Sequence, residues 1–206
     1  MEIVKINNVR LVKNMKQIRQ NTFETNSSST HSICISKNPV VDVRNKHVYF
    51  GSGEFGWSTD TVTDTASYLY TAMVTAYSPQ EFREKLEKLK NILDKYGITY
   101  DFSPVEEIKS DYTPDYSYLV FTKDRYASVD HAAECIPFIE SLLNDEDMLL
   151  RYLFGDSCIY TGNDNSNEYD DDCYRAFDTI WDDEKHEEVP NYKHDEEHYD
   201  YFFKGN

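Results

Sequence analysis

The chain has 206 residues, 39% of them hydrophobic and 15% aromatic, which excludes an intrinsically disordered protein and predicts a core rich in Tyr and Phe. Many of the 17 Tyr hydroxyls then need a polar partner or a solvent edge. The formal net charge of −17 argues against direct binding of nucleic acid, because that binding depends on Lys and Arg at phosphates.

Charge is unevenly distributed along the chain. Residues 1–50 hold eight Lys or Arg and three Asp or Glu, whereas residues 145–206 hold five Lys or Arg and nineteen Asp or Glu. This difference predicts either docking of the two ends on each other or an acidic interaction face. An acidic face attracts basic proteins, including those that bind nucleic acid, although the same charge can serve solubility alone.

The N-terminal segment has polar residues every few positions, so we expect neither a secretory signal nor a membrane span. The four cysteines form no CxxC pair, which favours reduced, buried thiols over a zinc site. These features predict a protein of the reducing cytoplasm. The cysteines are Cys34, Cys135, Cys158 and Cys173.

The first half of the chain predicts strands followed by two helices. We expect a strand or hairpin in residues 1–12, a short strand at 33–35, and further β structure in 40–50. Apolar residues at helical spacing then predict a helix over 61–77. Ser78, Pro79 and Glu81 form a capping box with proline at the first helical position, so a second helix is predicted over 78–96, ending at Gly97.

The second half of the chain predicts more strands and helices. Strands are expected at 98–102, 117–121 and 157–161, and helices at 128–143, kinked by Pro137, and at 146–154. Residues 162–167 are predicted to form a loop, and a further helix is expected near 174–181.

These elements predict an α+β fold with a mostly antiparallel sheet and four to five packed helices. Residues 1–169 are expected to form a single domain. Residues 170–206 are expected to form an acidic, aromatic C-terminal extension packed on that domain.

The first candidate site is the hydroxyl- and amide-rich segment 23–32. Glu24, Ser28 and His31 provide a carboxylate, a hydroxyl and an imidazole, the groups required for nucleophilic catalysis. Asn26 and Ser27 add polar groups that suit phosphate binding. The alternative is a turn-rich segment whose side chains bond to neighbouring backbone.

The second candidate site is the glycine-rich segment 51–57. It contains a GxGxxG pattern, but the helix and the later acidic residue of a dinucleotide-binding fold are missing. We therefore predict a loop that brings Glu54 and Trp57 to a surface or cleft.

The third candidate site lies in residues 155–165, where Asn163 and Asp164 follow a predicted strand. Their oxygen atoms suit a hard cation, so a divalent cation remains open as a ligand, although the EF-hand spacing is absent. No other cofactor is predicted. His194 and His198 are four residues apart, with His186 nearby, but they do not form an HExxH motif.

The runs RQNTFETNSSSTHS at 19–32, FGSGEFGW at 50–57 and YTGNDN at 160–165 resemble, in this order, a group of proteins encoded by phages and prophages of low-GC bacteria. The resemblance covers about residues 19–165. It implies the cytoplasm of a bacterial host during infection or lysogeny, and it implies no particular reaction. Because three separate polar segments are shared, we expect them to come together in space.

Two functions compete, and a third remains open. The first is a phage counter-defence or host-takeover protein that inhibits a basic or nucleic-acid-handling host protein through an acidic surface, as a nucleic-acid mimic. The second is an enzyme that modifies a nucleotide or nucleic acid at the Glu/Ser/His segment. The third is a structural or regulatory accessory protein of the phage. None of the three requires a membrane, and the sequence leaves the oligomeric state open.

Overall fold

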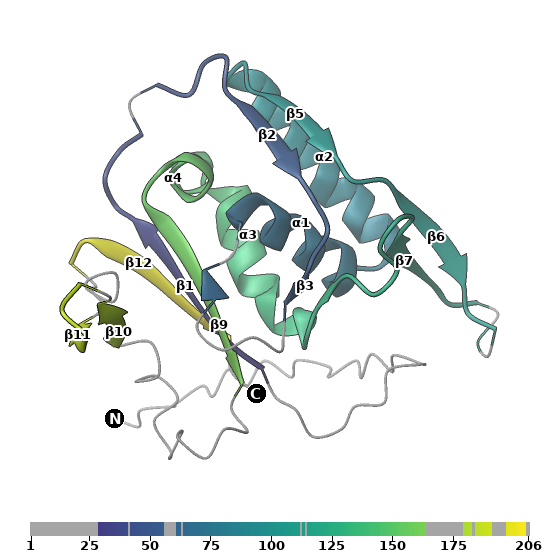
Figure 1. The fold of residues 1–206 in the computed structure, drawn as a ribbon. Coiled ribbons are helices and arrows are strands. Elements are labelled where there is room, and N and C mark those ends of the chain that lie inside the picture. Colours follow the sequence, from purple (N-terminus) through teal and green to yellow (C-terminus); the bar gives the residue numbers. More distant parts are fainter. Residues whose placement is uncertain are drawn as a thin grey trace, which may run out of the picture.

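The computed structural model describes residues 29–40, 42–55, 61–62, 64–111, 113, 115–163, 179–182, 184–190 and 197–204. The mixed α+β class is confirmed (Figure 1). The elements in chain order are β1 (Ser29–Ser36), β2 (His47–Phe50), β3 (Glu54–Phe55), β4 (Thr61–Val62), α1 (Thr65–Ala76), α2 (Pro79–Lys95), β5 (Thr99–Phe102), β6 (Val105–Lys109), β7 (Ser117–Phe121), β8 (Ser128–Val129), the 3₁₀ helix η1 (Ala132–Cys135), α3 (Ile136–Asn144), α4 (Glu146–Phe154), β9 (Ser157–Asn163), β10 (Thr179–Asp182), β11 (Glu187–Pro190) and β12 (Tyr199–Lys204).

The largest sheet has four antiparallel strands in the order β12-β1-β9-β4. The C-terminal strand β12 lies beside β1, so the acidic end of the chain contributes to the same sheet as the first described strand. The other strands form separate pairs instead of one continuous sheet. The pairs β6–β7 and β10–β11 are antiparallel, whereas β2–β5 and β3–β8 are parallel.

Helices α1, α3 and α4 lie between the four-stranded sheet and the β2–β5 pair (Figure 1). Helix α1 contacts β2, β8, α2 and α3, which places it at the centre of the molecule. Its N-cap residue is Asp64, whose carboxylate accepts a hydrogen bond from Ser67 N. The predicted capping box of α2 is confirmed, since Ser78 and Glu81 bond to each other's backbone N–H.

Four local predictions are wrong. Ser29–Ser32 lies in β1 and not in a polar turn, and Gly162 and Asn163 lie in β9, because the two strands pair with each other. Residues 179–181 belong to β10, where a helix was expected. Pro137 introduces no mid-helix kink, because α3 begins at Ile136 and the proline sits in its first turn, where no N–H is needed.

The core is aromatic, as expected, and the structure shows where its hydroxyls go. Tyr68, Tyr70 and Tyr152 are among the largest fully buried side chains. Tyr70 Oη donates to Ser103 O at 2.9 Å, and Tyr152 Oη donates to Thr65 O at 2.6 Å. Each buried phenol therefore keeps a hydrogen bond, which offsets the cost of removing a hydroxyl from water.

Three cysteines, Cys34, Cys135 and Cys158, are buried, and Cys173 lies outside the described residues. Among the described helices, none combines the length and the apolar character needed to cross a lipid bilayer. The predicted strand or hairpin in residues 1–12 and residues 174–178 of the predicted helix also lie outside the described part of the chain.

Candidate functional site

Two of the three sequence motifs meet at one end of the four-stranded sheet. Because β1 and β9 are antiparallel, Ser29 of the first motif pairs with Asn163 of the third, and His31 pairs with Thr161. On the other edge of β9, Thr61 of β4 pairs with the same Thr161. The start of β1 and the end of β9 are seen together at the bottom of Figure 1. The described ends of these two motifs are thus neighbours, as expected.

The second motif reaches the same place through Phe55 in β3. The rings of Phe55 and Tyr68 are 5.2 Å apart between centroids, and the rings of His31 and Tyr68 are 5.4 Å apart. Tyr68 comes from α1, on the turn after the Asp64 cap. Residues of the first and second motifs therefore contact one buried tyrosine, and the third motif pairs with His31.

A chain of three buried polar groups runs through this end of the core. His31 Nδ1 and Tyr68 Oη share a hydrogen bond of 2.6 Å, and Tyr68 Oη lies 3.4 Å from Cys135 Sγ. All three side chains are at most 1% exposed. Burial, followed by the neighbouring Cys135, raises the pKa of Tyr68 well above its usual value, so the phenol stays protonated as a hydrogen-bonding group.

This geometry fits a positioning role for His31 better than direct attack on a substrate. A general base must lie within hydrogen-bond reach of the proton that it removes, and the His31 side chain is fully buried. Its hydrogen bond to Tyr68 instead joins β1 to α1. The catalytic role of His31 stays a prediction, and it requires a substrate to reach this buried imidazole.

A second histidine, which the sequence did not single out, is accessible at the same end. Asp130 and His131 directly follow β8, and Asp130 N donates to Phe55 O at 3.1 Å. Because β3 and β8 are parallel, their carboxyl ends meet at the same edge. His131 Nε2 lies 3.8 Å from Asp130 Oδ1, and both side chains are about one-third exposed (36% and 30%). This pair has the composition and the access of a proton-transfer site.

The backbone at His131 is left-handed, with φ of 48° and ψ of 40°. Left-handed residues other than glycine are uncommon, although Asn, Asp and His tolerate this region better than most. The conformation turns the chain from β8 into η1. It therefore sets the direction in which the imidazole leaves the backbone.

The structure places three of the nine predicted site residues. His31 is buried in β1, Glu54 is exposed on β3, and Asn163 is the last residue of β9. The sequence analysis missed Tyr68, Cys135, Asp130 and His131. Asp130 and His131 fell within the predicted helix 128–143, and the strand that precedes them forms only by pairing with β3. The remaining predicted residues, which lie outside the described part of the chain, are Glu24, Asn26, Ser27, Ser28, Trp57 and Asp164.

The structure gives no support to a metal site within the described residues. Among them, no group of three or more His, Cys, Asp and Glu side chains is arranged to hold a metal ion. Asp156, in the segment suggested for a hard cation, accepts a hydrogen bond from Tyr199 Oη at 3.0 Å. His186 and His198 lie in turns, and His194 is outside the described residues.

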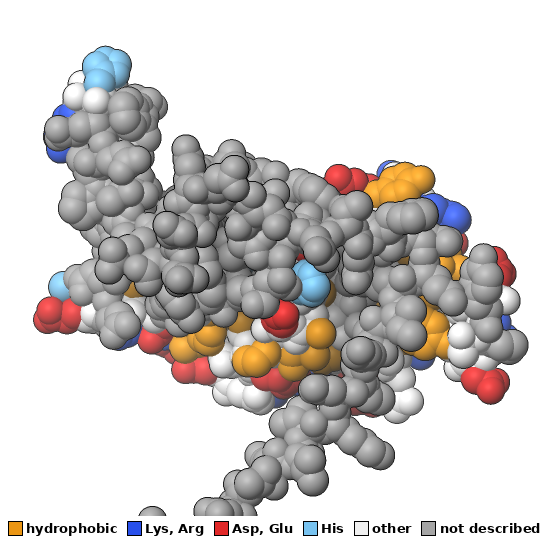
Figure 2. All heavy atoms as spheres, turned by 90° about the horizontal axis from the view of Figure 1, so that it is seen from below, with side chains coloured by type: hydrophobic (Ala, Val, Ile, Leu, Met, Phe, Trp, Pro, Cys, Tyr) orange, Lys and Arg blue, Asp and Glu red, His pale blue; other side chains and the backbone are white. Residues whose placement is uncertain are grey.

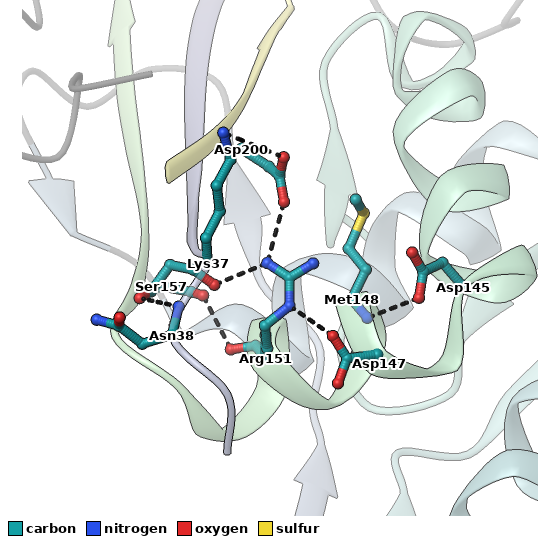
Figure 3. Close-up of polar contacts among 9 residues, drawn as sticks. Lys37, Asn38, Asp145, Asp147, Met148, Arg151, Ser157 and Asp200 are labelled. Atoms are coloured by element: carbon teal, nitrogen blue, oxygen red, sulfur yellow. Dashed lines mark hydrogen bonds and ion pairs between the residues drawn. The ribbon is translucent and has the colours of Figure 1, made fainter. Parts of the chain in front are cut away.

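A second polar cluster lies at the opposite end of the sheet, around the buried guanidinium of Arg151 in α4 (Figure 3). Its Nη1 donates to Ser36 O at 2.8 Å and to Asp200 Oδ2 at 3.0 Å, and its Nε donates to Asp147 Oδ2 at 3.0 Å. Ser157 Oγ donates to the Arg151 carbonyl at 3.0 Å. The contacts join α4 to β1, β9 and β12. They stabilise the packing of the C-terminal strand β12, and the groups of the cluster pair with one another without a ligand.

No protein-family model matches the chain, and no curated protein or solved structure matches it either.

Proposed function

We propose that the protein is a phage-encoded counter-defence or host-takeover factor, which binds and inhibits a basic, nucleic-acid-handling host protein through its acidic surface. The observation that carries this proposal is the way charges are paired. The described Lys and Arg residues are mostly engaged with carboxylates of the same chain, so the large excess of carboxylates stays available.

The ion pairs show this directly. Cations on several elements lie within 4.0 Å of a carboxylate, including Arg83 with Glu107, Lys85 with Glu140, and Lys95 with Glu146. The remaining cations in such pairs are Lys37, Arg44, Lys90, Arg125 and Arg151. Ion pairs of this kind add little stability at an exposed surface, but they neutralise the positive charge.

Acidic side chains then remain exposed over much of the described surface. On the face shown in Figure 2, they recur along the rim and among hydrophobic side chains. Exposed carboxylates without an ion pair among the described residues include Glu54, Glu84, Asp111, Asp115 and Glu134. Such a surface attracts a basic partner and repels free nucleic acid.

The test is a pull-down from bacterial host lysate with the purified protein, at about 0.1 M and about 0.5 M salt, followed by mass spectrometry. We expect one dominant basic protein at low salt and much less of it at high salt, because salt screens exposed charge. That partner, once purified, should lose its own activity on nucleic acid when this protein is added. If no partner is retained, or if a bound partner keeps its activity, the inhibitor proposal is wrong.

A second candidate function is supported by the contacts of the first two motifs with Tyr68 and by the pairing of the third motif with His31. We infer that, if the protein is an enzyme acting on a nucleotide or nucleic acid, its accessible proton-transfer group is His131 with Asp130. His31 would then act as a positioning residue, through its hydrogen bond to Tyr68 in the core beneath the site. Clustered polar groups of this kind are typical of active sites.

The enzyme candidate is tested by incubating the protein with nucleoside triphosphates and with single-stranded oligonucleotides and analysing the products. His131→Asn should lower any turnover by about 100-fold or more, because it removes the imidazole, whereas asparagine tolerates the left-handed backbone. His186→Asn is the matched control, since His186 is also exposed and left-handed (φ 55°). Equal activity of the two variants would exclude His131 as the catalytic group.

A further inference from the structure

The β6–β7 hairpin has two faces of different character. Its register pairs Glu106 with Val120 and Ile108 with Tyr118, so these four side chains share one face, which we call the outer face. Ser110 N donates to Tyr116 O at 2.9 Å, which continues the pairing and puts Tyr116 on the outer face as well. The hairpin extends away from the helices at one end of the molecule (Figure 1).

The opposite face of the hairpin is covered by the rest of the protein. Phe121 is buried, and Val105 and Leu119 pack against the core. Glu107 on that face pairs with Arg83 of α2 at 3.1 Å. In contrast, Ile108, Tyr118 and Val120 are not among the hydrophobic side chains packed against the core. The outer face is therefore apolar and only partly covered within the described structure.

The outer face carries an aromatic pair. The rings of Tyr116 and Tyr118 are stacked, with centroids 6.2 Å apart and an angle of 24° between the planes. Tyr118 is 36% exposed, which makes it one of three exposed large hydrophobic side chains in the described residues. Exposed tyrosines with an apolar surround are typical of protein interfaces, where Tyr and Arg are enriched.

The charge around this face is negative. The exposed Asp111 and Asp115 lie in the connection between the two strands, and Glu106 on the face itself is already paired with Arg125. The one basic residue of the two strands, Lys109, lies on the opposite face because it pairs with Ser117. Arg125 already reaches Glu106 from the next turn, with its Nη2 2.8 Å from Glu106 Oε1. A guanidinium is thus accommodated at the edge of this face.

We propose that the outer face of β6–β7 is the docking surface for an arginine-rich segment of the basic partner. This inference rests on the proposed function and names the surface that performs it. Guanidinium groups stack on tyrosine rings and pair with carboxylates through two N–H groups, whereas a lysine ammonium is a compact, strongly hydrated charge. The combination of stacked tyrosines with flanking carboxylates therefore selects arginine over lysine.

The experiment measures fluorescence polarisation of two labelled peptides, one of arginines and one of lysines, with equal length and charge, against the full-length protein. We expect the arginine peptide to bind about tenfold more tightly. Tyr118→Ser should weaken binding of the arginine peptide by about fivefold and leave the lysine peptide unchanged. Tyr49→Ser is the control, because Tyr49 is 57% exposed on β2, outside the hairpin. Circular dichroism establishes that both variants are folded.

Several outcomes overturn the inference. Equal binding of both peptides, or no effect of Tyr118→Ser, would mean that only overall charge attracts them. A dimer that forms at increasing concentration and is lost in Tyr118→Ser would mean that a second copy occupies the face. If the host partner binds wild type and Tyr118→Ser equally, the docking surface is wrong but the proposed function stands. If the peptides behave as expected and no host partner exists, the function fails while the surface stands.

Discussion

Tyr68 joins segments that lie far apart in the sequence. Its hydroxyl contacts His31 from β1 and Cys135 from η1, and its ring contacts Phe55 from β3. All of these groups are buried, so water cannot replace a hydrogen bond that is lost. The stability of this end of the core therefore depends on one phenol.

We expect Tyr68→Phe to lower the free energy of unfolding by about 1–3 kcal/mol, because it removes the hydroxyl that holds the His31 imidazole in the core. Urea denaturation followed by circular dichroism measures the change. Tyr126→Phe is the control, since Tyr126 is 83% exposed, and it should change the free energy by less than about 0.5 kcal/mol. Similar values for the two variants would show that the buried hydrogen bond adds nothing.

Arg151 joins whole elements in the same way, because its guanidinium connects α4 to β1 and β12. Its side chain is 9% exposed and bonds to the end of β1 and to Asp200 in β12, whereas Asp147 is 75% exposed. The bond to Asp147 is an i,i+4 pair at the surface and adds little. The contacts with Ser36 O and Asp200 carry the stabilisation, because Ser36 is buried and the Asp200 side chain is 29% exposed, far less than that of Asp147.

Arg151→Met should lower the free energy of unfolding by about 2–3 kcal/mol, since it leaves Ser36 O without its charged donor and leaves Asp200 with only the Lys37 ammonium at 4.0 Å. Hydrogen exchange of the backbone amides of β12 should speed up more than that of α2, because only β12 loses an anchor. Asp147→Asn is the control and should change stability by less than about 0.5 kcal/mol. Unchanged protection of β12 would contradict this role of Arg151.

Elements with complete local signals were predictable, and elements made by distant pairing were not. Helix α2 has its cap, its proline and its terminal glycine within the segment itself, and its bounds agree with prediction. Ser29–Ser32 has the composition of a turn, yet it forms a strand because β9 pairs with all of it and β12 pairs with His31 and Ser32 on the other side. The parallel pairing of β2 with β5 across helices α1 and α2 likewise leaves no local mark.

The same division applies to the candidate site. The composition of segment 23–32 identified His31 as a candidate catalytic residue, and the three motifs were expected to meet. Composition could not show that the imidazole is buried, because its partner Tyr68 is 37 positions away. Asp130 and His131 gain their place beside the second motif from the pairing of β3 with β8, which is again non-local.

For the molecule as a whole, the aromatic core makes stability depend on pH in the alkaline range. Burial raises the pKa values of Tyr68 and Tyr152 well above the usual value of 10.0, and it raises the pKa of Tyr70 to about 12. These phenols stay protonated in the folded protein at a pH where they ionise in the unfolded chain. The unfolded state then binds fewer protons, so the free energy of unfolding falls as pH rises.

The stabilisation is fully present below pH about 10 and is lost above it. For each such phenol, the free energy of unfolding should fall by about 1.4 kcal/mol per pH unit within that window. Urea denaturation at a series of pH values from neutral to alkaline measures the slope, and tyrosinate absorbance of the folded protein reports which phenols ionise. Tyr152→Phe should reduce this slope by the contribution of one proton, about 1.4 kcal/mol per pH unit, because it removes one buried phenol. This holds whatever the substitution does to stability at neutral pH. An unchanged slope in this variant would mean that Tyr152 ionises as readily in the folded protein as in the unfolded chain.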